Sequence, residues 1–183
     1  MRRLVASALI VACATLSSGC GLIEDATGER SRTPLGALET FKGEGFRIKL
    51  PCIPAKTTDS IPVQGRAKPL KLRAWSCEDP DTAYLVGVAR LPADVQFSLD
   101  GVAPGIADYG DGKVVMNKRL TYAGVPARDI RVETTDLGEP ATVFVLAFVR
   151  DRSLYQVQGI VVGEHTTKPP ALYRKVLKSL TFE

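Results

Sequence analysis

Histidine, methionine and tryptophan are scarce in this sequence of 183 residues, which contains one histidine, two methionines and one tryptophan. A single histidine excludes a metal site built from several histidines, and it leaves His165 as the one candidate for histidine-based catalysis. The four cysteines are too few for a scaffold that depends on many disulfides. The sequence therefore gives no indication of a metal or of another cofactor.

Neither sign of charge dominates the chain. It has 24 lysines and arginines against 20 aspartates and glutamates, with a formal net charge of +4. This balance argues against nucleic-acid binding, which usually needs a strongly basic surface. The hydrophobic content of 45% and the charged content of 24% are typical of a folded domain, and the length favours a single domain.

The N-terminal segment has the layout of a bacterial export signal. The positive Met1-Arg2-Arg3 is followed by an uncharged, largely apolar stretch from Leu4 to Leu16. At about 1.5 Å per residue this stretch covers about 20 Å, which is short of the ~30 Å core of a bilayer. The pattern therefore predicts a signal peptide over residues 1–19.

Cys20 follows the small residues Ser17, Ser18 and Gly19, and this arrangement resembles a lipobox. The usual leucine three residues before the cysteine is replaced by Ser17. The resemblance implies that the thiol of Cys20 carries a diacylglycerol and that the mature chain is anchored by acyl chains to the outer face of the cell membrane. The alternative is ordinary cleavage, which would release a secreted protein.

Composition divides the rest of the chain into two parts. Residues 20–44 mix glycine, serine, threonine and alternating charges with few core-forming side chains, which predicts a flexible tether. Residues 45–183 contain alternating and continuous apolar runs, which predict one globular domain.

Strand patterns outnumber helix patterns in this domain. The expected helices are a short one near residues 99–106 and a C-terminal one over 171–179, and most neighbouring strands are close enough in sequence for short loops. This order predicts an α+β fold in which a central antiparallel β-sheet is flanked by helices. The expected strands cover residues 46–50, 70–77, 83–91, 113–122, 127–133, 141–149 and 154–162, with an edge strand within 56–64.

Residues 45–183 contain five short motifs, which are GFRIKLP with the following Ile53-Pro54, FSLDGV over 97–102, AGVPAR over 123–128, RSLYQV over 152–157 and VLKSLTF over 176–182. In this order they resemble the motifs of PsbP-like bacterial envelope proteins. The resemblance implies an antiparallel sheet sandwiched by helices, but it implies little about function, because that fold serves several unrelated roles. No catalytic residue follows from it.

Cys52 and Cys77 are the cysteines that remain after the predicted signal and Cys20. Each falls at the end of an expected strand, and in an exported protein two such thiols tend to pair as a disulfide. Two buried free thiols are the main alternative, and a redox or metal-binding pair is another.

A basic interaction surface is expected on the early strands, with Arg47 and Lys49 on one and Lys71 and Arg73 on the other. These side chains could face anionic lipid headgroups, or they could be the solvated sides of the strands. Trp75 is in phase with Lys71 and Arg73. It is therefore either exposed for a partner or turned into the core by a β-bulge.

Two further polar residues have a structural and a functional interpretation. Arg128 follows the predicted turn at 123–126, where we expect it to pair with Asp129 or Glu133 or to anchor the turn to a neighbouring strand. His165 is expected in a loop, either as a solvated side chain or as the base of a hydrolase.

The sequence as a whole favours a non-catalytic, lipid-anchored envelope protein that binds or scaffolds another protein. A small-ligand or lipid-binding domain is the second hypothesis, and it requires an apolar concavity between sheet and helices. A hydrolase that uses His165 is the third.

Overall fold

The computed structural model describes residues 37–61, 69–79, 81–93, 96–135 and 138–183 of the chain, apart from the side chains of residues 60 and 61. The predicted signal peptide, Cys20 and the tether up to residue 36 lie outside the described residues. Their export, acylation and flexibility therefore stay predictions.

Ten strands and two α-helices make up the described part of the chain. The strands are β1 (Glu39–Lys42), β2 (Phe46–Leu50), β3 (Ala55–Ile61), β4 (Leu70–Asp79), β5 (Thr82–Arg90), β6 (Lys113–Tyr122), β7 (Val125–Thr134), β8 (Ala141–Arg150), β9 (Ser153–Val162) and β10 (Thr181–Phe182). The helices are the 3₁₀ turn η1 (Leu99–Gly101), α1 (Val102–Tyr109) and α2 (Tyr173–Ser179).

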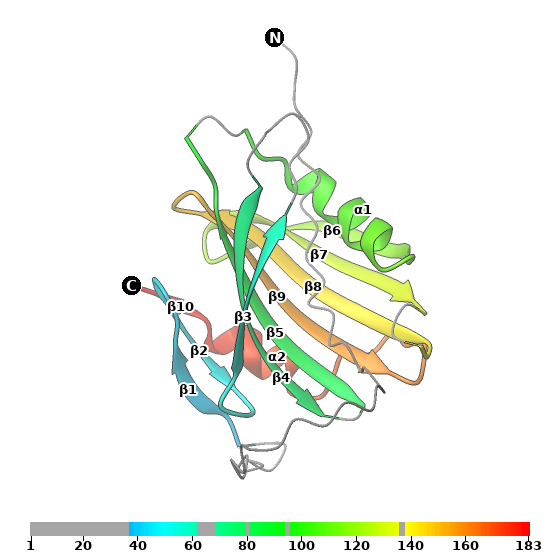
Figure 1. Cartoon of the computed structure of the whole chain (residues 1–183). Coiled ribbons are helices and arrows are strands. Elements are labelled where there is room, and N and C mark those ends of the chain that lie inside the picture. Colours follow the sequence, from blue (N-terminus) through cyan, green and yellow to red (C-terminus); the bar gives the residue numbers. More distant parts are fainter. Residues whose placement is uncertain (1–36, 62–68, 80, 94–95, 136–137) are drawn as a thin grey trace, which may run out of the picture.

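The strands form two antiparallel sheets. The large sheet has the order β3-β4-β5-β9-β8-β7-β6, and the small sheet has the order β1-β2-β10. Figure 1 shows the small sheet, with β1 and β2 in blue and β10 in red, on one side of the large sheet together with α2, also in red, while α1, in green, covers the other side. The prediction of a mainly antiparallel sheet is confirmed.

Hydrophobic side chains fill the space on both sides of the large sheet. The small sheet and α2 enclose one cluster that includes Phe46, Trp75 and Phe148. On the opposite face, Val102 and Ile106 of α1 pack on apolar residues of β7 and β8. A third cluster consists of Leu70, Leu72, Ala89, Leu91 and Leu154.

The layer over one face differs from the expected helix-only layer. The small sheet covers much of that face beside the seven-residue α2, so helices alone do not flank the large sheet. The small sheet also includes residues 39–42, which the sequence assigned to the tether, because β1 pairs with β2 from Glu39↔Leu50 to Lys42↔Arg47. The folded part of the chain therefore begins before the predicted boundary at Gly45.

Trp75 belongs to the core, with 4% of its surface exposed. The expectation of a bulge was wrong, because β4 pairs with β3 and β5 in unbroken register from Leu72 to Ser76. Trp75 does share a face with Lys71 and Arg73. It is buried because the small sheet brings Phe41 and Phe46 over it, with ring centroids 5.6 and 5.4 Å away.

Cys52 and Cys77 form a disulfide with 5.8 Å between their Cα atoms, which confirms the predicted pair. Cys52 lies just after β2 of the small sheet, and Cys77 lies in β4 of the large sheet. The bond therefore joins the two sheets covalently.

The two helices follow the apolar spacing that predicted them. Pro104 lies in the first turn of the eight-residue α1, where the backbone N–H that proline lacks would have no partner within the helix. The stripe expected on α2 is buried at Leu172, Val176 and Leu180. In the described part of the chain, no helix is both long and apolar enough to cross a bilayer.

Candidate functional site

The hairpin of β6 and β7 brings two arginines side by side. Ala123 and Gly124 form its two-residue loop, with φ values of 48° and 80°, as in a type I′ turn. This turn sets Tyr122 opposite Val125, and the register that follows sets Arg119 opposite Arg128. Both arginines therefore belong to the face of the sheet that carries α1.

Arg128 and Arg119 converge on one carboxylate. Arg128, whose side chain is only 10% exposed, forms an ion pair with Asp100 Oδ1. The same oxygen lies 3.6 Å from Nη2 of Arg119, which is 79% exposed. Asp129 and Glu133, which the sequence offered as partners of Arg128, alternate onto the opposite face of β7, so that expectation was wrong.

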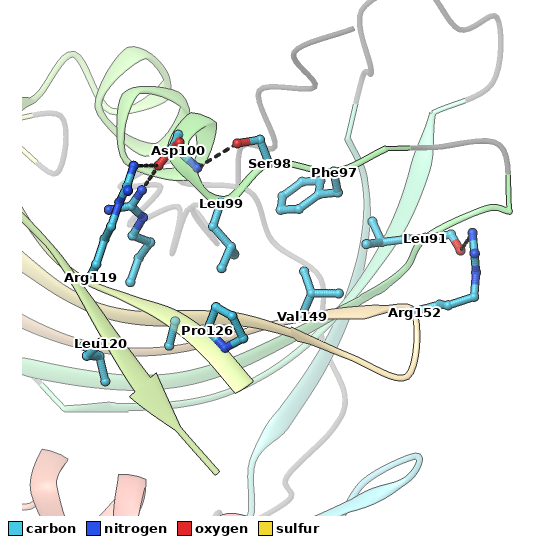
Figure 2. A pocket seen from close by; sticks show the side chains of 12 residues that line it. Leu91, Phe97, Ser98, Leu99, Asp100, Arg119, Leu120, Pro126, Val149 and Arg152 are labelled. Carbon is cyan, nitrogen blue, oxygen red and sulfur yellow. Dashed lines mark hydrogen bonds and ion pairs between the residues drawn. The ribbon is translucent and has the colours of Figure 1, made fainter. Parts of the chain in front are cut away.

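The segment before α1 holds Asp100 over the sheet. Ser98 caps η1, because its side-chain oxygen accepts a hydrogen bond of 3.2 Å from the backbone N–H of Asp100. With this turn fixed, Leu99 points from η1 toward Pro126 and Val149 on the sheet (Figure 2). Phe97 and Leu99 pack on the cluster around Leu91 rather than forming a sealed core of their own.

A groove of about 680 Å³ runs between this segment and the sheet. Figure 2 shows Phe97 and Leu99 above it, Pro126 and Val149 below it, and Leu91 toward one end. It is open to solvent, and its lining is a mixture of apolar side chains and arginines.

Arg152 lies at the opposite end of the groove from Arg119 (Figure 2). It occupies the two-residue turn between β8 and β9, where Asp151 and Arg152 have φ values of 48° and 56°. Its guanidinium donates hydrogen bonds to the backbone carbonyls of Leu91 and Pro92. These bonds fix the chain that leaves β5 against the rim of the groove.

The groove therefore carries more positive than negative charge. Its lining includes Arg119, Arg128 and Arg152 but Asp100 as its single acidic residue. An apolar floor favours a hydrophobic side chain or tail, and the surplus of arginine favours an anionic group next to it. This arrangement suits recognition of a ligand.

The basic residues expected to form an interaction surface are divided between β2 of the small sheet and β4 of the large sheet. Arg47 forms an ion pair of 2.8 Å with Glu183, and Arg73 forms an ion pair with Glu44 beside a smaller recess of about 210 Å³. Lys49 and Lys71 are exposed on different sheets, whereas Trp75 is in the core. Exposure of Trp75 to a partner is therefore excluded, and ion pairs offset part of the remaining charge.

His165 is exposed in the segment between β9 and α2. It lines neither the groove nor the smaller recess, so neither of them places a nucleophile beside it. In the described part of the chain, no three of His, Cys, Asp and Glu lie close enough together to hold a metal ion.

Sequence reasoning missed the groove because its parts come from five separate segments of the chain. One signal was available, since a two-residue turn at Ala123 and Gly124 fixes the pairing of Arg119 with Arg128. No signal in the sequence identified Asp100 as their common partner.

Comparisons with known proteins support the fold. The solution structure of cyanobacterial PsbP (CyanoP) from Synechocystis sp. PCC 6803 is similar to this chain with a TM-score of 0.51 and 11% sequence identity. The match covers 89% of this chain and 100% of that one. No protein-family model matches the sequence, and no curated protein matches it. The chain thus has a PsbP-like fold, as the motifs implied.

Proposed function

We propose that this chain is a lipid-anchored protein of the cell envelope that binds or scaffolds another protein and does not itself catalyse a reaction. The anchor is the acylated Cys20, and the tether after it leads to the PsbP-like domain. The groove beside η1 is the binding site. In this proposal, the membrane fixes where the domain acts and the groove selects what it binds.

The groove is the observation that supports binding. It lies between a capped 3₁₀ turn and two tight hairpins, so its walls are already formed, and a preformed site reduces the entropy lost when a partner is bound. Phe97 and Leu99 are only partly buried there, so a partner would remove further apolar surface from water.

A small ligand or lipid is the second candidate, because a volume of about 680 Å³ falls within the range of small-molecule sites. The groove is open to solvent, whereas such sites usually enclose most of their ligand. This difference favours a protein segment, which needs contact on one side only.

Binding is tested by cross-linking the full-length, tagged chain in its own envelope and identifying what is captured with it. Phe97→Ala should reduce capture of the partner several-fold, because Phe97 lines the groove. Tyr109→Ala is the matched control, since Tyr109 is a 40% exposed aromatic at the far end of α1. Equal capture by both variants and by the unaltered chain would contradict the groove as the site, and repeated failure to capture any protein would contradict the function.

The anchor is tested separately by the mass of the mature N-terminus. We expect a chain that begins at Cys20 and carries the added mass of its acyl groups, and Cys20→Ser should release the protein from membranes. A mature chain without acyl groups would contradict anchoring and leave the secreted form.

A further inference from the structure

Strand β6 ends the large sheet on the side of the groove. It extends over ten residues, and among the strands that the structure describes it pairs with β7 alone. An edge strand of this length presents a row of backbone N–H and C=O groups to which another strand can bind. A β-bulge between Val114 and Met116 interrupts its first part, whereas the register from Met116 to Tyr122 is regular.

The hairpin geometry identifies which backbone groups face outward. Tyr122 and Val125 flank the two-residue turn, so they form a hydrogen-bonded pair, and such pairs alternate with non-hydrogen-bonded ones along the hairpin. It follows that Asn117, Arg119 and Thr121 direct their N–H and C=O groups away from β7.

The apolar side chains of β6 are incompletely buried, as expected for a strand with a neighbour on one side only. Val114, Leu120 and Tyr122 pack against the hydrophobic clusters, yet each remains partly exposed. A strand laid beside the regular part of β6 would remove further surface of Leu120 and Tyr122 from water, which contributes about 25 cal/mol for each Å² of apolar surface.

The charge of β6 indicates the chemistry of that strand. It contains Lys113, Lys118 and Arg119 and no acidic residue. Lys113 and Lys118 lie opposite Glu133 and Asp129 of β7, whereas Arg119 lies opposite another arginine, Arg128. Arg119 also lies at the rim of the groove, where it shares the single carboxylate of Asp100 with Arg128. A second copy of β6 would bring like charges together, which destabilises a strand pair.

We propose that an extended, acidic segment of a partner protein adds as a further strand to β6 across Asn117 to Thr121, with one acidic side chain on Arg119. This is β-strand addition, in which backbone hydrogen bonds supply affinity and side chains supply specificity. The inference rests on the proposed function, since it names the chemistry of the protein that the domain binds. The added strand lies against the rim of the groove, which a neighbouring part of the partner then fills.

The test introduces the photo-cross-linking residue p-benzoylphenylalanine at Thr121 of the full-length chain in its own envelope, and mass spectrometry identifies the cross-linked peptide. The same residue at Thr58 in β3, the opposite edge of the sheet, is the positional control. We expect an acidic peptide of another protein at Thr121 and not at Thr58.

Two pairs of variants connect the cross-link to the geometry. Asn117→Pro removes an outward N–H and should lower the yield roughly five- to thirtyfold, whereas Asn117→Ala keeps that N–H and should preserve it. Arg119→Glu should lower the yield at least roughly tenfold, because it places like charges together. Lys175→Glu is the control, since it makes the same charge change at an exposed site on α2.

A cross-link to a second copy, to lipid or to a peptide without acidic residues would overturn the proposal, as would the absence of any cross-link at Thr121. An unchanged yield in Asn117→Pro, with its fold verified by circular dichroism, would also overturn it. If Phe97→Ala still reduces capture while the β6 variants do not, the binding function stands and strand addition fails. If no protein is captured in either experiment, both fail.

Discussion

At the scale of single residues, Gly159 in β9 determines how closely α2 approaches the large sheet. A Cβ atom at this position would lie 2.7 Å from Cδ2 of Tyr173, which is closer than side chains tolerate. Tyr173 is buried, and its hydroxyl donates a hydrogen bond of 3.0 Å to the carbonyl of Val157. Burial raises the pKa of this hydroxyl far above its usual range, so Tyr173 stays neutral.

Gly159→Ala should therefore lower the free energy of unfolding by about 1–3 kcal/mol, because the Tyr173 ring must shift within a packed core. Urea denaturation measures this loss. Gly110→Ala is the control, since its added Cβ would make an ordinary contact of 3.4 Å with Thr134. Equal stability of the two variants would show that Tyr173 moves aside without cost.

The ion pair of Arg128 with Asp100 provides a second prediction at this scale. Asp100→Ala removes the carboxylate that pairs with Arg128, whose side chain is only 10% exposed in the unaltered chain. Breaking a fully buried pair costs several kcal/mol, but water reaches Asp100, so we expect a loss of about 1–2 kcal/mol. Thermal unfolding checks this value. Asp108→Ala on the exposed side of α1 should stay within about 0.5 kcal/mol of the unaltered chain.

At the scale of elements, the backbone direction of β6 has a consequence for stability. Asn117→Pro should cost less than about 1 kcal/mol, because the N–H that it removes faces solvent. Lys118→Pro removes an N–H that points to β7, so it should cost about 3 kcal/mol or more. Denaturation of the two adjacent variants measures the difference. A larger loss of stability in Asn117→Pro than in Lys118→Pro would show that the N–H of Asn117, and not that of Lys118, points to β7.

Two ion pairs connect Glu183, the residue after β10, to the other two strands of the small sheet. Lys42 and Arg47 donate hydrogen bonds to Glu183, at 3.1 and 2.8 Å, and these bonds lower the pKa of its carboxyl group below the usual value. A lowered carboxyl pKa contributes stability above the unfolded-state pKa of about 4.5, and this contribution disappears as the pH falls through the folded-state value.

Glu183→Gln should therefore lower the melting temperature slightly at pH 7, and the difference from the unaltered chain should vanish in acid. Melting curves recorded from pH 7 to pH 3 test this. High salt should reduce the difference at pH 7, because the pair is exposed. A difference that persists at pH 3 would mean that the carboxylate charge is not its cause.

The elements that the sequence predicted well are those whose pattern is long. The strand at residues 113–122 was placed at its observed bounds, and the continuous apolar run from Ala141 became β8 in the middle of the sheet. β1 and β10 were missed because they contain four and two residues, and each forms only through pairing with β2. Such pairing is a tertiary effect that local periodicity does not record.

The candidate site was less predictable than the fold for the same reason. The choice of Asp100 rather than Asp129 as the partner of Arg128 depends on where η1 crosses the sheet, and no local pattern specifies that crossing. The burial of Trp75 likewise required a second sheet, and two of its three strands, β1 and β10, are too short to recognise from the sequence.

At the scale of the whole molecule, the disulfide of Cys52 with Cys77 holds the two sheets together. Closing a loop with a sequence separation of 25 residues contributes about 3.5 kcal/mol by chain-entropy arithmetic. The double variant Cys52→Ser/Cys77→Ser should lose roughly this amount in urea denaturation. A reducing agent should destabilise the unaltered chain to the same level and leave the variant unaffected. An equally stable variant would show that packing alone holds the sheets.

The same disulfide makes the stability of the fold depend on the redox conditions around the chain. Before the two thiols are oxidised, only packing and backbone pairing hold the small sheet over Trp75. The reduced chain should therefore unfold more easily than the oxidised one. After oxidation, the disulfide also holds the small sheet over the aromatic cluster of Phe46, Trp75 and Phe148. The disulfide therefore adds its stability only in an oxidising compartment, and a chain kept under reducing conditions should unfold and be degraded more readily.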